Sequence, residues 1–421
     1  MSINVYIEKL VYGGEGLAYL EGKSVFVPFV LPHETVRATI VKEGKRFVRA
    51  HPGQIVIPSS LRMTPTCPHF EQCGGCHYQQ MSYDDQVQFK VEILRETLSR
   101  IGKIDLLVPI QMVCSPPWNY RNRSRFHLNR QAGSVKIGYF ESGSNRLCPV
   151  EECPISSHRI NQVLHGLLCA IKEPRFPKGI GEIEVFAQDR EAMLDLFSNV
   201  PFSQVSPIGD ILFEHLPLLK SIAFHTPDHT EIVGPGAITV HAAGFSYRIS
   251  HTVFFQTNAS LLDKIVEVAV GPVEGGEVAL DLYCGAGLFT LPLTRRYQKV
   301  IAVDANPAAI DDLRFNALQE KVQIEAYSNA VDRFLTRRDI PRPNHILMDP
   351  PRIGLGPQVT QEIIRLFPES ITYISCDPAT LSRDLSALII AGYKISSFHF
   401  IDLFPQTFHI ESIVQLTRGT S

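Results

Sequence analysis

Asp281-Leu282-Tyr283-Cys284-Gly285-Ala286-Gly287 joins an apolar strand to a turn with two glycines, and the architecture of the chain follows from this junction. From Ser260 onward, apolar segments of strand length alternate with segments of helical periodicity. The predicted strands cover residues 278–283, 300–304, 323–327, 345–349, 371–376, 394–404 and 412–417. This alternation predicts an α/β fold built on a doubly wound parallel sheet.

The glycine turn predicts a nucleotide-type ligand, because ligands of open α/β sheets bind beyond the carboxyl ends of the strands. A dinucleotide fingerprint would place a third glycine at position 290, where this chain has Thr290. Asp304 ends the next predicted strand, where an acidic side chain accepts hydrogen bonds from ribose hydroxyls. S-adenosylmethionine, with one ribose and no diphosphate, therefore fits better than NAD. A plain glycine turn is the structural alternative.

Length and composition predict a soluble protein of several domains. A chain of 421 residues, 44% of them hydrophobic, can bury a core in each of its domains. No segment offers the roughly 18 uninterrupted apolar residues of a membrane helix, so we expect a cytoplasmic protein without membrane association. Nine cysteines, an odd number, favour reduced thiols over a disulfide framework. The net charge of -3 does not by itself indicate nucleic acid.

Three parts of the chain differ in pattern. Residues 1–58 alternate in short strands, which predicts a small β-barrel. Residues 59–255 contain a cysteine-rich segment, a helix predicted over residues 84–101 and a β-rich region with another helix around residues 160–171. Residues 256–421 hold the predicted parallel sheet. We therefore expect three domains with these boundaries.

Two motifs at predicted strand ends carry chemistry. Asp349-Pro350-Pro351-Arg352 is a rigid turn that presents a carboxylate at the ligand edge. A similar turn with an aromatic fourth residue serves methyltransferases that act on exocyclic nitrogens. Arg352 differs from that aromatic residue, so a carbon atom is the rival to nitrogen as the methylated position. Cys376 ends the fifth predicted strand, where ligands bind, although a buried structural cysteine is the alternative reading.

A thiol and a carboxylate together suit methylation of uracil at C5. A thiolate that adds to C6 makes C5 nucleophilic enough to attack a sulfonium methyl group. A base must then remove the C5 proton, and Glu411 is the candidate, with a strand-end surface carboxylate as the alternative. A free thiol has a pKa of about 8.5, so the site must favour the thiolate or deprotonate the thiol during attack.

Three blocks of sequence closely resemble the RNA (uracil-5-)-methyltransferases, which make 5-methyluridine. The blocks are Asp349-Pro350-Pro351-Arg352-Ile353-Gly354, Ser375-Cys376-Asp377-Pro378-Ala379-Thr380-Leu381 and the segment from Asp402 to Glu411. The resemblance implies a Rossmann-like class I methyltransferase domain that uses S-adenosyl-L-methionine, with Cys376 as nucleophile and Glu411 as base. It also implies cofactor contacts at Gln256, Tyr283, Asp304 and Asp349, with Asn329 as a further candidate. Asp377 stands where Asn is common, and Thr372 replaces an aliphatic residue.

The amino-terminal part narrows the substrate. Residues 1–58 resemble a TRAM domain, an RNA-binding β-barrel, with Gly13-Gly14-Glu15-Gly16-Leu17-Ala18 as its turn. Many family members that modify tRNA lack this barrel, so the resemblance favours 23S ribosomal RNA as the partner. The same reaction on tRNA is one alternative. A noncatalytic RNA-binding iron-sulfur protein is an alternative of another class, and no obligate protein partner is expected.

A cysteine cluster precedes the first predicted long helix. Cys67, Cys73 and Cys76 supply three thiols, and Gly74-Gly75 lets the backbone fold tightly around a metal centre. On spacing alone, Cys148 and Cys153 compete as the fourth ligand. Zinc, with His69 or His77 as another ligand, rivals a [4Fe-4S] cluster. The resemblance, through Cys153-Pro154-Ile155, implies Cys153 and a structural iron-sulfur cluster.

The remaining expectations concern RNA contacts and spare thiols. Arg121, Arg123 and Arg125 alternate, so a strand would place them on one face as a phosphate-binding ridge, with an ion-paired sheet face as the alternative. The target uridine must be extruded from its stack, and Phe254 or Phe255 is expected to stack on it. Three further cysteines are expected to be small buried apolar residues: Cys114, Cys169 and Cys284.

Overall fold

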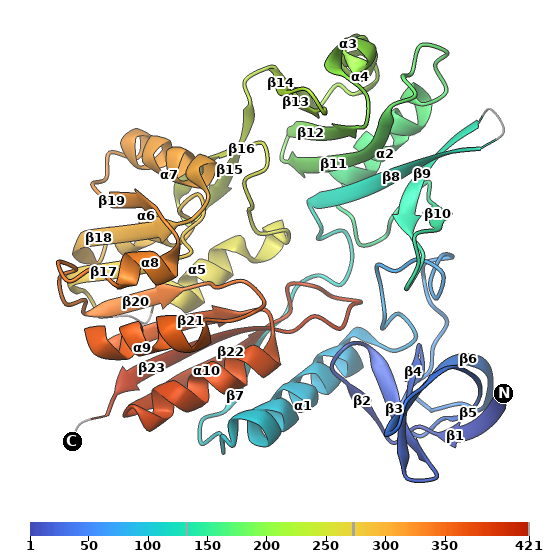
Figure 1. Cartoon of the computed structure of the whole chain (residues 1–421), viewed down its shortest axis with the longest axis horizontal. Helices are drawn as coiled ribbons and strands as arrows, with labels where there is room; N and C mark the ends of the chain where they lie inside the picture. The colour runs from blue at the N-terminus through green and yellow to red at the C-terminus, as the bar shows by residue number, and fades with distance from the viewer. Residues whose placement is uncertain (132–133, 272–273, 420–421) are drawn as a thin grey trace.

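The computed structural model describes residues 1–131, 134–271 and 274–419. Within them the strands form sheets of six, seven, two and eight strands (Figure 1). The described residues contain no helix that is long and apolar enough to span a membrane.

The six-stranded sheet comes first in the chain and rolls up beside helix α1 (Figure 1). Its order is β1-β5-β6-β4-β3-β2. Alternate residues are buried, as in β1, where Ile3 and Val5 enter the core and the residues between them face solvent. The strands are β1 (Ser2–Tyr6), β2 (Lys9–Val11), β3 (Glu15–Leu20), β4 (Lys23–Pro28), β5 (Thr35–Glu43) and β6 (Phe47–Ile57).

Helix α1 (Tyr83–Gly102) confirms the helix predicted over residues 84–101. Its amino end is capped by Ser82, whose hydroxyl accepts a hydrogen bond from Asp85 N, and two acidic residues lie in the first turn. It ends at Lys103, which takes a left-handed conformation. The helix packs on α10 (Pro378–Ile390) and reaches β2 of the barrel. It therefore connects the first part of the chain to the last.

The central region is a seven-stranded sheet of order β10-β9-β8-β11-β12-β13-β14, followed by a two-stranded ribbon. The sheet strands are β8 (Arg123–Gln131), β9 (Ser134–Phe140), β10 (Leu147–Pro149), β11 (Ile180–Gln188), β12 (Glu191–Ser198), β13 (Leu219–His225) and β14 (Thr230–Val233). The ribbon is β15 (Ala237–Ala242) and β16 (Phe245–Ser250). The helices are α2 (His158–Ala170), α3 (Phe202–Val205) and α4 (Ile208–His215). The β-rich pattern and the helix predicted near residues 160–171 are confirmed.

The last sheet has the order β19-β18-β17-β20-β21-β23-β22-β7, and its first five strands are parallel. The strands are β17 (Gly276–Leu282), β18 (Tyr297–Asp304), β19 (Glu325–Ser328), β20 (His345–Met348), β21 (Ser370–Ser375), β22 (Tyr393–Ile401), β23 (Glu411–Arg418) and β7 (Ile110–Val113). The helices are η1 (Ala259–Leu261), α5 (Leu262–Val270), α6 (Thr290–Leu293), α7 (Pro307–Gln319), α8 (Val331–Leu335), α9 (Gly356–Leu366) and α10. The predicted doubly wound sheet is confirmed.

Helices cover both faces of this sheet, which explains its nearly continuous apolar strands. Successive residues of β17 enter opposite cores: Ala279 packs with α5 and α7, and Leu280 packs with α9 and α10. One strand comes from far away in the sequence. β7 pairs in parallel with β22 and forms the edge of the sheet. The domain boundaries at residues 58 and 255 stay a prediction.

Candidate active site

The parallel strands bring five predicted site residues to one edge of the last sheet. Tyr283, Asp304, Asn329, Asp349 and Cys376 each lie at, or directly after, the carboxyl end of one of the five parallel strands. The backbone connects neighbouring ends, since Asn329 N donates to Asp304 O at 2.9 Å. This edge is where an open α/β sheet binds its ligand.

The glycine turn has two glycines with different tasks. Tyr283, Gly285 and Gly287 all have positive φ, at 64°, 53° and 98°. A Cβ added to Gly285 would meet no atom within 4 Å, whereas one added to Gly287 would lie 2.4 Å from Leu313 Cδ1. Gly285 thus faces open space that a ligand can enter, and Gly287 allows α7 to pack closely.

The Asp304 carboxylate binds the backbone of the glycine turn. Its Oδ2 accepts a hydrogen bond from Gly285 N at 2.9 Å, and its Oδ1 accepts one from Asn306 N at 2.8 Å. Asn306 in turn caps α7 by accepting from Ala308 N. The carboxylate is therefore oriented at the turn where the sequence predicts a ribose contact.

Asp281 is a candidate site residue that the sequence alone did not reveal. Its side chain is buried on the α7 face of the sheet and accepts a hydrogen bond from Thr290 Oγ1 at 2.5 Å, while Oδ1 has no partner in the described residues. Burial raises the pKa of Asp281 to about 7. An acidic residue inside an otherwise apolar strand is the signal that could have revealed it.

The register of strands β21 and β23 places Cys376 and Glu411 next to each other. Strands β21 and β23 are antiparallel, and Ser375 pairs with Ser412, so the next positions along each strand are Cys376 and Glu411. The Glu411 side chain is buried, and burial and the neighbouring Asp349 hold its pKa well above the usual range. The ionised form of such a carboxyl group is a stronger base, and Glu411 must be ionised before it can accept a proton.

The thiol and the carboxyl groups of this pocket influence one another. Burial, followed by the charges of Glu411 and Asp349, raises the pKa of Cys376 to about 12, and the Arg352 guanidinium acts in the opposite direction. Burial alone raises the pKa of Asp349 to about 7. A cation bound among these groups would favour their ionised forms, because opposite charge lowers the pKa of an acid.

The presence of Asp377 at a position where Asn is common has a structural explanation. Its side chain caps α10, and Oδ1 accepts hydrogen bonds from Ala379 N and Thr380 N, both at 2.9 Å. Asp and Asn are similarly good caps, so either residue serves here. Thr372 is buried and donates to Ala269 O at 3.1 Å, which satisfies its hydroxyl inside the core.

Tyr12 of the barrel is a second residue that sequence reasoning missed. Its hydroxyl lies 3.4 Å from Cys376 O, and its ring packs edge-on against Phe408 at 5.6 Å between centroids. Tyr12 and Cys376 are 364 positions apart in the chain, so no local pattern reveals the contact. The barrel therefore reaches the loop that carries the candidate nucleophile.

The segment before η1 contains the remaining predicted cofactor residue. Gln256 is buried next to Phe255, which packs in the core at 5.6 Å from the ring of Tyr247 and so is not free to stack on a base. Phe254 is 61% exposed and is the one of the two that can do so. No hydrogen bond of the Gln256 side chain with the other site residues is seen in the described part of the chain.

Four thiols converge elsewhere in the molecule. Cys67, Cys73, Cys76 and Cys153 line one cavity of about 150 Å³, together with His69. In the ranges that the structure describes, no three His, Cys, Asp or Glu side chains form a group that could hold a single metal ion. Cys148 does not line this cavity and is buried in the core of the central sheet.

Two expectations about spare residues are wrong. Cys114 and Cys169 are exposed, and of the three spare thiols only Cys284 is buried. Cys114 directly follows the end of β7, and Cys169 is the penultimate residue of α2, where a sequence pattern does not reveal which side faces solvent.

The arginine row is not a free phosphate-binding ridge. Arg123 is largely buried, with its guanidinium 4.5 Å from the centre of the Phe186 ring. Arg125 forms an ion pair with Glu184 at 2.5 Å. Acidic residues of the neighbouring strand β11 thus form ion pairs with Arg123 and Arg125, and Arg121 and Arg125 also line the cysteine cavity.

Comparison with known proteins identifies the family. The model of the tRNA (uracil-5-)-methyltransferase family matches residues 234–419, and that of the TRAM domain matches residues 2–52. An uncharacterized RNA methyltransferase of Aquifex aeolicus is 32% identical over 98% of this chain and 98% of its own length. The 23S rRNA (uracil(1939)-C(5))-methyltransferase RlmD of Salmonella paratyphi A is 30% identical over 99% of this chain and 96% of its own length.

A solved structure shares the whole fold. The tRNA (uracil-54, C5)-methyltransferase of Pyrococcus abyssi, solved in complex with S-adenosyl-L-homocysteine, aligns with a TM-score of 0.78 at 24% identity, over 99% of this chain and 100% of that one. The chain therefore belongs to the family of S-adenosylmethionine-dependent RNA (uracil-5-)-methyltransferases, enzymes that methylate C5 of uridine in RNA.

Proposed function

We propose that this enzyme methylates a uridine of 23S ribosomal RNA through a covalent adduct between Cys376 Sγ and C6 of the base. The observation that carries the mechanism is the register of β21 and β23, which puts Cys376 beside the buried carboxyl group of Glu411. The RNA is proposed from the barrel and from relatives of 30% identity that are named for 23S rRNA. Methylation of tRNA is the second candidate, because the enzyme of similar fold acts on tRNA.

In the proposed reaction, the Cys376 thiol loses its proton and sulfur bonds to C6, which turns the ring into an enolate. C5 then attacks the methyl group of S-adenosylmethionine, and S-adenosylhomocysteine leaves. Glu411 takes the C5 proton as the base, the C5–C6 double bond re-forms, and the C6–S bond breaks. Gln256, Tyr283, Asp304, Asn329 and Asp349 are proposed to hold the methyl donor.

We further propose that Cys67, Cys73, Cys76 and Cys153 bind a [4Fe-4S] cluster that cross-links the central region. All four thiols line one cavity, and burial raises the pKa of Cys73 to about 12, so thiolates here need a cation to stabilise them. A single zinc ion would require sulfur atoms within about 2.3 Å of one point. The cavity of about 150 Å³ that the four thiols line is common to both metal centres, so the metal content of the protein decides between zinc and the cluster.

Three experiments test these proposals. A 5-fluorouridine RNA should leave a stable adduct on Cys376, and the covalent mechanism fails if turnover of natural RNA persists while no adduct forms. Mapping 5-methyluridine in ribosomal and transfer RNA of a deletion strain separates the two substrates. Purified protein should be brown and contain iron, and a colourless zinc protein would refute the cluster.

Membership of a family of enzymes favours catalysis over a noncatalytic RNA-binding protein, and loss of methyl transfer in Cys376→Ala tests this directly. A cytoplasmic location is proposed because that is where ribosomal RNA is found.

A further inference from the structure

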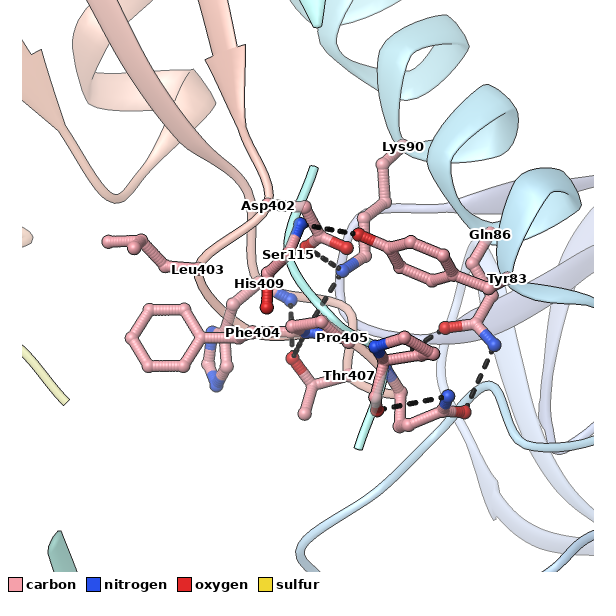
Figure 2. A network of polar contacts seen from close by, with 12 residues as sticks. Tyr83, Gln86, Lys90, Ser115, Asp402, Leu403, Phe404, Pro405, Thr407 and His409 are labelled. Carbon is pink, nitrogen blue, oxygen red and sulfur yellow. Dashed lines mark hydrogen bonds and ion pairs between the residues drawn. The ribbon is translucent and has the colours of Figure 1, made fainter. Parts of the chain in front are cut away.

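The loop from Asp402 to Ile410 connects β22 to β23 and leads directly into Glu411. Residues that lie more than 300 positions away hold it. Some belong to α1 (Figure 2), and others to the segment that follows Cys76. The catalytic chemistry does not use these residues, so their contacts require another explanation.

Lys90 and Asp402 form an ion pair inside the protein. Both side chains have no exposed surface, and Lys90 Nζ lies 2.8 Å from Asp402 Oδ1. The same ammonium group donates to Phe404 O at 3.0 Å, so one side chain of α1 holds two points of the loop (Figure 2). A buried charge that loses its partner strongly destabilises its surroundings, so this pair restricts where the loop can lie.

Gln86, one helical turn earlier, holds the middle of the loop. Its Nε2 donates to Gln406 Oε1 at 3.0 Å, and its Oε1 accepts from Gln406 N at 2.9 Å. Gln406 has a φ of 68°, which a residue with a side chain rarely adopts without support. The reciprocal hydrogen bonds from a buried glutamine provide that support.

The segment after the cysteine motif holds the same residue from its other side. His77 N and Tyr78 N both donate to Gln406 O, at 2.8 and 3.1 Å. The His77 ring also packs against Phe408 at 4.7 Å between centroids. Gln406 is thus fixed through its amide, its carbonyl and its side chain.

We propose that Gln86 and Lys90 are positioning residues for the catalytic base, because they fix the loop that leads into Glu411, whose strand lies in register with that of Cys376. The proposal rests on the covalent adduct of the proposed function. It assigns the two residues to the removal of the C5 proton, whereas sulfur addition and methyl transfer depend on Cys376 and the glycine turn. A displaced base would therefore leave the methylated ring bound to Cys376, still carrying its C5 proton.

The test compares Lys90→Met and Gln86→Leu with wild type, using RNA and a methyl-labelled donor. We expect turnover to fall at least tenfold while the labelled protein–RNA adduct, seen on a denaturing gel, rises at least threefold. Glu411→Gln should show the same pattern in stronger form, and Cys376→Ala should show no adduct. Arg62→Met is the control, since it breaks a partly buried ion pair with Glu34 away from the loop, and its ratio of adduct to turnover should equal that of wild type.

Two results would overturn the positioning role. One is normal turnover in both variants, and the other is a parallel loss of adduct and turnover, which is the result expected of general damage. The double variant Lys90→Met/Asp402→Leu removes both buried charges, so it remains informative where Lys90→Met does not fold. If Cys376→Ala keeps turnover, the proposed function fails instead, and the two failures are distinguishable.

Discussion

The two glycines of the ligand turn should respond differently to the same added methyl group. At Gly285, a Cβ would meet no atom, so Gly285→Ala loses only the conformational preference for positive φ, about 1–2 kcal/mol of folding stability. At Gly287, the Cβ would also lie 2.4 Å from Leu313 Cδ1. Overpacking adds about 1–3 kcal/mol, so Gly287→Ala should cost about 2–5 kcal/mol in total.

Ligand binding should show the reverse order. The open space above Gly285 is where the methyl donor is proposed to approach the backbone, so the new methyl group of Gly285→Ala competes with the ligand. We expect at least a tenfold weaker affinity for S-adenosylhomocysteine, which corresponds to about 1.4 kcal/mol. In Gly287→Ala, the protein that remains folded should bind within a few-fold of wild type.

Urea denaturation measures the free energy of unfolding of each variant, and titration calorimetry measures ligand affinity. Relief of the clash by Gly287→Ala/Leu313→Ala is a control for the packing contact, because the double variant should lose less stability than the two single changes added together. Unchanged affinity in Gly285→Ala would contradict the placement of the ligand above this turn.

Three further predictions concern charge, stacking and metal binding. Burial raises the pKa of Asp281 to about 7, whereas an aspartate of the unfolded chain has a pKa of about 3.9. The folded state therefore binds the proton of Asp281 more tightly, and the free energy of unfolding falls as pH rises from about 4 to 7. Asp281→Asn should therefore be more stable than wild type at pH 8 and flatten that slope, and an unchanged slope in thermal melts would refute the assignment. Phe254→Ala should weaken RNA binding by about 1–3 kcal/mol with little change in stability, whereas Phe255→Ala should cost about 3–5 kcal/mol of stability; equal effects on RNA affinity in filter binding would contradict this division. Cys153→Ser should lower the iron content of purified protein, measured by elemental analysis, and Cys148→Ser should not. The opposite result would make Cys148 the fourth ligand in place of Cys153.

Local patterns were sufficient for most of the secondary structure. Apolar runs and helical periodicity predicted the five parallel strands, and the glycine turn after β17 pointed to the ligand edge, because the ends of parallel strands share one side of a sheet. The predicted helix of residues 84–101 was correct within about one residue at each end, since Ser82 and the acidic first turn are local signals.

Interactions between distant segments could not be read in this way. Strand β7 joins the edge of the last sheet, Tyr12 contacts the Cys376 backbone, and Glu184 neutralises Arg125, each through pairing of residues far apart in sequence. The arginine row shows the difference most directly. Alternation predicted a shared face, but the acidic residues opposite it come from another strand.

The amino-acid sequence was enough to specify the element types, the ligand edge and the candidate residues Cys376 and Glu411, because strand ends and turns depend on nearby residues. Tertiary packing settled which residues surround them. The register of β21 and β23 brings the thiol and the carboxyl group together, and the contacts of α1 hold the loop that leads into Glu411. The physical reason is that burial and charge pairing arise only once segments separated by hundreds of residues share a core, and these two effects set the pKa values on which the chemistry depends.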